Sequence, residues 1–304
     1  MKIIGPDLLV FGVDDLETCS KFLLDYGLKK TESSTSGGSF AALDGTSIII
    51  RKSNDGTLPA AVAAAPTCRE TVYGVVDKAA LEAIGAELSK DRNVKLVNGV
   101  LRSTDADGYG IGFQITQRRD PQARHYGVNV PYQAPGRRHN EVAANDDADI
   151  RPYTLSHVMF FSPDSARAEK FYVSRLGFRV TDYFAGAGAF MRPAASNDHH
   201  TVFFLQAPCL GVQHFTFHFA GASEVLKNGW EFARKGYKSF WGPGRHVLGS
   251  NYFWYFNSPL GGLMEMDADM DRHDDAWTPR SVPVTEDTSQ IFLLQPTGKW
   301  VPHE

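Results

Sequence analysis

The chain has 304 residues, of which 42% are hydrophobic, and a formal net charge of −4. This length allows two domains that each bury a core, and the low charge without a long basic run argues against nucleic acid as the main partner. No apolar run is long enough to span a bilayer and the N-terminus lacks a signal-peptide pattern, so no membrane association is expected. Cys19, Cys68 and Cys209 are odd in number and far apart, which favours a reduced, cytoplasmic protein over a disulfide framework.

One pattern occurs twice along the chain: an apolar strand, an acidic turn and a short amphipathic helix. It covers residues 8–28 and again residues 157–178. In both copies an Asp stands where a helix N-cap belongs and a Gly where a C-cap belongs. The capping residues are Asp15 and Gly27 in the first copy, and Asp164 and Gly177 in the second.

A second similarity, between residues 107–114 and residues 259–265, extends the repetition. Self-similarity at this spacing predicts two related α+β domains. A linker is expected between them because this stretch is rich in Pro, Gly, Asn and charged residues. The expected division is an N-terminal domain over residues 1–118, a linker over 119–151, a C-terminal domain over 152–275 and a tail over 276–304.

Aromatic and β-branched runs between Gly and Pro residues predict the elements of the second domain. The expected strands are 154–162, 178–192, 200–207, 212–219, 251–257 and 261–267, and the expected helices are 164–175 and 222–235. Eight of the ten histidines lie at or after His157, and none precedes His125. In the N-terminal domain, Leu8 is expected to match His157 and Gln114 to match Glu265, so that domain is predicted to lack metal ligands.

Three residues in apolar strands are candidate metal ligands: His157, His214 and Glu265. An ionised carboxylate in an apolar strand is costly unless it is paired or metal-bound. Two histidines and one carboxylate leave coordination positions open and suit non-haem Fe(II). A lone histidine in such a strand is more often a hydrogen-bonded core residue. His218 shares a strand face with His214 at about 7 Å, and spacing leaves the choice between these two open.

Four further residues are candidates for acid–base or binding roles. His199 and His200 are adjacent on a strand and point to opposite faces, so only one of them can face a cavity. His246 follows a Gly-rich sequence, and a surface position is equally consistent with that context. Tyr255 lies in an aromatic strand, where most tyrosines are core residues with one satisfied hydroxyl.

Residues 244–265 contain a Gly, a His two residues later, a Trp-Tyr pair, and then a Pro, a Gly and a Glu. This order resembles the signature of the type I extradiol ring-cleavage dioxygenases of the vicinal oxygen chelate superfamily. Two positions depart from the signature, because Trp254 stands where an aliphatic residue or Phe is usual and Ser258 where an acidic or amide residue is common. The resemblance also covers the duplication and the strands around His157 and His214.

The resemblance implies two tandem domains of paired βαβββ modules, each forming a curved, barrel-like mixed sheet. It implies Fe(II) as the cofactor, with Mn(II) as an alternative, held by the three candidate ligands. His200 would be the acid–base residue, and His246 and Tyr255 would hydrogen-bond the substrate. The implied reaction is cleavage by O2 of a catecholic ring, such as catechol or 2,3-dihydroxybiphenyl, next to its hydroxyls, by a homo-oligomer that degrades aromatic compounds.

Two other functions compete with this interpretation. A glyoxalase-like isomerase or thiol transferase of the same superfamily usually holds a second carboxylate as ligand or base, and has no use for the His246–Tyr255 pair. A non-catalytic ligand-binding relative would not need three metal ligands. Ring cleavage is therefore the favoured hypothesis.

Overall fold

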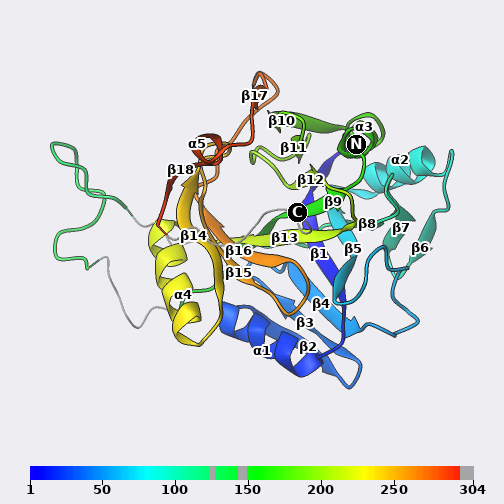
Figure 1. The fold of residues 1–304 in the computed structure, drawn as a ribbon, viewed down its shortest axis with the longest axis horizontal. Coiled ribbons are helices and arrows are strands. Elements are labelled where there is room, and N and C mark those ends of the chain that lie inside the picture. Colours follow the sequence, from blue (N-terminus) through cyan, green and yellow to red (C-terminus); the bar gives the residue numbers. More distant parts are fainter. Residues whose placement is uncertain (123–126, 143–148, 295–304) are drawn as a thin grey trace.

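The computed structural model describes residues 1–122, 127–142 and 149–294, and it contains two mixed β-sheets with helices packed against them (Figure 1). The N-terminal sheet has the strand order β2-β3-β4-β1-β5-β8-β7-β6. The C-terminal sheet has the order β17-β10-β11-β12-β9-β13-β16-β15-β14-β18. In the described residues the two end strands of each order do not pair with each other, so the sheets are curved but do not close into barrels.

Each sheet contains two βαβββ modules, whose first strands lie side by side at its centre. The first N-terminal module is β1 (Ile3–Val13), α1 (Leu16–Tyr26), β2 (Lys29–Ser34), β3 (Gly37–Ala41) and β4 (Ser47–Lys52). The second is β5 (Thr67–Val75), α2 (Lys78–Leu88), β6 (Lys95–Val97), β7 (Val100–Thr104) and β8 (Gly110–Ile115).

The C-terminal sheet repeats this arrangement, which confirms the predicted α+β fold of paired βαβββ modules. Its first module is β9 (Thr154–Ser162), α3 (Ser165–Leu176), β10 (Phe178–Phe184), β11 (Gly188–Pro193) and β12 (Val202–Gln206). Its second is β13 (Gly211–His218), α4 (Ala222–Arg234), β14 (Ser239–His246), β15 (Tyr252–Asn257) and β16 (Leu263–Ala268).

Local signals account for the ends of the first helix of each sheet. Asp15 and Asp164 each accept a backbone N–H of the first helical turn at 3.0 Å. Gly27 and Gly177 end these helices in the left-handed region, with φ of 112° and 75°, a conformation that glycine adopts at little cost. The predicted caps are confirmed. Among the described residues, no helix combines the length and the apolar character needed to cross a membrane.

Two predictions about the strands are wrong. The expected single strand 178–192 is a hairpin of β10 and β11. His246 was expected in a Gly-rich loop, but it ends strand β14, which pairs with β15 through register shifts on either side of Trp241. Bulged strands accept Gly and Pro residues, so the composition of this segment concealed a strand.

Part of the expected C-terminal tail also belongs to the C-terminal sheet. It forms β17 (Arg280–Val282), α5 (Glu286–Ser289) and β18 (Gln290–Leu293). β17 pairs with β10 at one end of the sheet and β18 with β14 at the other, as the red segments of Figure 1 show. The strands that pair here are far apart in sequence, and no local pattern predicts their pairing.

A single hydrophobic core cluster includes residues from both sheets. Two buried tyrosines of the N-terminal half reinforce this junction with hydroxyl hydrogen bonds to the C-terminal half. Tyr26 donates to the carbonyl of Glu265 at 2.6 Å, and Tyr109 donates to the carbonyl of Phe161 at 2.7 Å. A buried tyrosine needs such a partner for its hydroxyl. The N-terminal half therefore supports strands β9 and β16 directly.

Candidate metal centre

Three neighbouring strands bring the predicted ligands together. His157 lies in β9, His214 in β13 and Glu265 in β16, and all three are buried. One ligand atom of each lies within 4.8 Å of those of the other two. The Nε2 atoms of the histidines are 3.1 Å apart, and Glu265 Oε2 lies 3.0 Å from His157 Nε2 and 3.6 Å from His214 Nε2.

The contacts of His214 and His218 decide the choice that spacing left open, and a β-bulge directly precedes His214. The register between β9 and β13 shifts between Val212 and His214, so Gln213 is an extra residue in β13. Bulges of this kind re-aim a side chain. His214 belongs to the cluster, whereas His218 Nδ1 lies 2.7 Å from Asp267 Oδ1. Although burial alone would lower it, this carboxylate raises the pKa of His218 to about 9.

Outer partners orient the two clustered imidazoles. Ser156 Oγ lies 2.8 Å from His157 Nδ1, and Gln213 Oε1 is hydrogen-bonded to His214 Nδ1. A bond at Nδ1 leaves Nε2 as the nitrogen that faces the cluster. Thr216 Oγ1 donates to Glu265 Oε2 at 2.6 Å and so orients the carboxylate.

The donor set fits a divalent metal ion. Burial lowers the pKa of His214 to about 3, so its imidazole is neutral, as metal ligation requires. Although burial alone would raise it, the neighbouring histidines, His157 foremost, hold the pKa of Glu265 well below its usual range. Glu265 Oε1 is buried and has no hydrogen-bond partner among the described residues. Two imidazole nitrogens and one ionised carboxylate thus lie close enough together to bind one ion.

A cavity of about 300 Å³ lies beside this cluster. His157 and His214 form part of its wall, together with His200, His246 and Tyr255. The His200 and His157 ring centroids are 4.3 Å apart, and His246 Nε2 lies 3.2 Å from the Tyr255 hydroxyl. Burial, together with the neighbouring imidazoles, holds the pKa of His200 well below its usual range.

His199 points away from this cavity, as predicted for one member of the pair. The predicted strand position of the two histidines is wrong, because both precede β12, which begins at Val202. Its Nε2 lies 2.9 Å from Asp182 Oδ2, and both side chains are fully buried. Among the lining residues, sequence reasoning missed several contributions: Leu248, Asn251, Val284 and Ser289. The last two come from the expected tail, and no local signal could have identified them.

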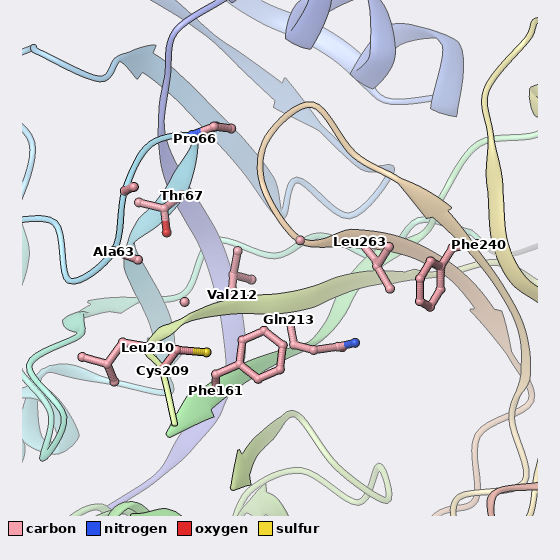
Figure 2. A pocket seen from close by; sticks show the side chains of 13 residues that line it. Ala63, Pro66, Thr67, Phe161, Cys209, Leu210, Val212, Gln213, Phe240 and Leu263 are labelled. Atoms are coloured by element: carbon pink, nitrogen blue, oxygen red, sulfur yellow. The ribbon is translucent and has the colours of Figure 1, made fainter. Parts of the chain in front are cut away.

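A second pocket, of about 410 Å³, lies between the two halves of the chain (Figure 2). Ala63, Pro66 and Thr67 of the N-terminal half face Phe161, Cys209 and Phe240 of the C-terminal half across it. Gln213 is its one amide side chain. Among the described residues its wall contains no titratable side chain besides a single thiol, so this pocket has fewer groups for catalysis than the cavity at the cluster.

Both register shifts between β9 and β13 recur between β1 and β5, and they define corresponding positions in the two sheets. Through these registers Leu8, Glu70 and Gly112 correspond to the three clustered residues, in the order His157, His214 and Glu265. The expected match of Gln114 with Glu265 is therefore wrong by two residues. In the strand register Arg102 lies opposite Gly112, and Tyr255 lies opposite Glu265, so Arg102 and Tyr255 occupy corresponding positions.

An internal ion pair occupies this N-terminal position. Arg102 Nε lies 2.9 Å from Glu70 Oε1, and the Glu70 side chain is 2% exposed. Gly112 leaves space for this ion pair, because a Cβ at position 112 would lie 3.2 Å from Glu70 Oε1. The guanidinium thus supplies the positive charge that a buried carboxylate requires.

The chain thus forms curved sheets of paired βαβββ modules, and the C-terminal sheet carries a two-histidine, one-carboxylate cluster beside a cavity. Residues 154–266 match the family model described as the Glyoxalase/Bleomycin resistance protein/Dioxygenase superfamily, and this part of the chain is a domain of that superfamily.

One curated relative and two solved structures illustrate the similarity. Metapyrocatechase 2 of Cupriavidus necator is 34% identical over 191 residues, which are 63% of this chain and 59% of that protein. The Mn(II)-bound glyoxalase from Novosphingobium aromaticivorans has a TM-score of 0.77 at 19% identity, covering 100% of this chain and 95% of that chain. The 2,2',3-trihydroxybiphenyl 1,2-dioxygenase from Sphingomonas wittichii strain RW1 has a TM-score of 0.74 at 18% identity, covering 97% and 100%. At these identities the structural likeness concerns the fold alone.

Proposed function

We propose that the chain is an extradiol dioxygenase that cleaves a catecholic ring with O2, with Fe(II), or alternatively Mn(II), as its metal. The convergence of His157, His214 and Glu265, two of which line the cavity, carries this proposal. The 34% identity with a protein named metapyrocatechase supports it. The three residues would hold the metal and leave positions open for a diol and for O2.

When bound, the metal supplies a Lewis acid that lowers the pKa of a diol hydroxyl and holds both reactants at one place. The chain's own residues orient and deprotonate the diol. His246 and Tyr255, hydrogen-bonded to each other at 3.2 Å, would bind one hydroxyl oxygen. His200, close to the His157 ring, would exchange a proton with the reacting oxygens.

The cavity suits a diol with a single ring. Its volume of about 300 Å³ lies at the low end of small-molecule sites, which range over about 300–1,000 Å³. The walls are largely apolar and include Phe184, Phe190 and Trp241. We therefore propose catechol or an alkyl-substituted catechol as a better substrate than 2,3-dihydroxybiphenyl.

The N-terminal half, which we propose forms a domain over residues 1–118, would have a structural role. The Glu70–Arg102 pair takes the position of the metal cluster there, and this supports the assignment. We also propose a cytoplasmic location, because Cys19, Cys68 and Cys209 are all free thiols. A homo-oligomer is proposed from the family resemblance, and light scattering would test it.

The alternative is a metal-dependent isomerase of the glyoxalase kind, and one comparison favours keeping it, since one of the similar structures is a Mn(II)-bound glyoxalase. A second carboxylate in the cavity would support that function. In the described part of the chain no Asp or Glu borders the cavity, and the cluster beside it contributes one carboxylate, Glu265. The wall instead offers His200, His246 and Tyr255, which suit a diol.

Oxygen uptake tests the proposal. Protein loaded anaerobically with Fe(II) is given catechol, 3-methylcatechol and 2,3-dihydroxybiphenyl in turn, and we expect one O2 per diol and a yellow ring-opened product. Glu265→Gln should abolish uptake, whereas the matched control Glu231→Gln, on the exposed side of α4, should retain it. A protein that binds one metal per chain but consumes no O2 with any diol would refute ring cleavage and favour the isomerase.

A further inference from the structure

A buried chain of hydrogen bonds leads from the surface of the C-terminal sheet to the cavity. Arg280 of β17 donates to Asp182 of β10, from its backbone N–H to Oδ1 at 2.8 Å and from Nε to both carboxylate oxygens at 3.2 Å. Asp182 Oδ2 lies 2.9 Å from His199 Nε2, and His199 Nδ1 lies 2.9 Å from His200 Nδ1. His200 ends the chain at the cavity wall.

The chemistry of these groups determines the direction of each bond. Although burial alone would raise it, hydrogen bonds from His199 and Arg280 lower the pKa of Asp182 to about 2. Asp182 is therefore a carboxylate, and it can only accept. Burial lowers the pKa of His199, so its neutral ring carries one proton, and that proton lies on Nε2, facing Asp182. His199 Nδ1 must then accept, and His200 Nδ1 must donate.

We propose that Asp182, acting through His199, holds His200 in the tautomer with its proton on Nδ1. The opposite ring nitrogen, Nε2, then presents a lone pair to the cavity, and His200 meets a diol hydroxyl as a hydrogen-bond acceptor. Asp182 and His199 are positioning residues, since neither borders the cavity among the described residues. The inference rests on the proposed function, because it specifies how His200 would meet the substrate.

The same C-terminal segment orients the second cavity histidine. His246 Nδ1 lies 3.2 Å from the backbone carbonyl of Ser289, which can only accept. His246 therefore carries a proton on Nδ1, and its Nε2 faces the Tyr255 hydroxyl at 3.2 Å. Arg280 and Ser289 thus belong to the same C-terminal segment. Arg280 supports His200 through Asp182 and His199, and Ser289 orients His246.

Imidazole 15N NMR tests the proposal without any measurement of activity. The full-length protein, labelled at histidine and loaded with diamagnetic Zn²⁺, should show His200 with a protonated Nδ1 and an unprotonated Nε2; His200→Gln assigns the signals. Asp182→Asn should reverse or mix this tautomer, because an amide offers only one acceptor oxygen where Arg280 and His199 both donate. The control Asp275→Asn, which changes an exposed carboxylate that pairs with Arg192, should leave the signals unchanged. A wild-type His200 protonated on Nε2 would overturn the proposal.

Kinetics with Fe(II)-loaded variants provide the second readout, and this one does not depend on whether Asp182→Asn folds. His199→Gln keeps an oxygen acceptor for His200 Nδ1, whereas His199→Leu removes it. We expect His199→Leu to lower kcat about 10²-fold with little change in KM, and His199→Gln to restore most of the loss. Equal losses in both variants would overturn the positioning role. If the wild type cleaves no diol while the NMR tautomer is as expected, the proposed function fails and the tautomer assignment stands.

Discussion

Gln213 offers a quantitative test of how the chain prepares the metal centre. Its carboxamide oxygen accepts the Nδ1–H of His214, and the residue is 3% exposed. Gln213→Met keeps a side chain of similar length but leaves a buried N–H without its partner. An unpaired buried donor costs about 1–3 kcal/mol, and about 1.4 kcal/mol corresponds to a tenfold change in an equilibrium constant. We expect divalent metal binding to weaken about 10- to 100-fold.

Competition with a chromophoric chelator measures this affinity, with Zn²⁺ as the probe so that oxidation of the metal does not interfere. Gln114→Met is the matched control, because that carboxamide bonds Asp7 in the N-terminal sheet. We expect the control to bind Zn²⁺ as the wild type does. A Gln213→Met protein that folds normally and binds Zn²⁺ as tightly as the wild type would refute the argument that the Nδ1 bond prepares His214 for ligation.

Three further changes test other parts of the molecule. Arg102→Met leaves the buried Glu70 carboxylate without its cation; the free energy of unfolding in urea should fall by about 1–3 kcal/mol with Zn²⁺ affinity unchanged, and a loss of affinity would contradict the separation of the two positions. Burial raises the pKa of Asp105 from 3.8 to about 7, so the folded carboxyl keeps its proton after the unfolded one has lost it. Stability should therefore fall as the pH rises through this window, by at most about 1.4 kcal/mol per pH unit. Asp105→Asn should flatten this dependence in urea titrations at several pH values, and an unchanged slope would count against the assignment. Val284→Trp should raise KM for 2,3-dihydroxybiphenyl more than KM for catechol, because Val284 borders the cavity; equal effects would show that the substrate does not reach this wall.

The sequence was informative where a residue conflicts with its surroundings or where a signal is local. Glu265 is an acid in an apolar strand, and this conflict predicted the cluster that it forms with His157 and His214. Helix caps are local signals, so the expected helix 164–175 differs by one residue at each end from α3 (Ser165–Leu176). In both cases the physical cause lies within a few residues of the pattern.

Long-range pairing could not be predicted from such patterns. Ser289 reaches His246 because β18 pairs with β14, far away in sequence. The match of Gln114 with Glu265 failed because similar Gly-rich turns were aligned, whereas the strand registers pair Gly112 at that position. The bulge at Gln213, directly before His214, is also a property of paired strands.

Comparison of the two related sheets supports a bound cation, supplied from outside the chain, at the cluster of His157, His214 and Glu265. In the N-terminal sheet the buried Glu70 carboxylate is neutralised by Arg102. The C-terminal sheet has Tyr255 at the position of Arg102, and burial raises the pKa of Tyr255 well above its usual range, so it supplies no charge. In the described part of the chain, the basic side chains that approach the Glu265 carboxylate are all histidines. A buried carboxylate among such groups is costly, and a bound divalent ion would neutralise it as the guanidinium neutralises Glu70.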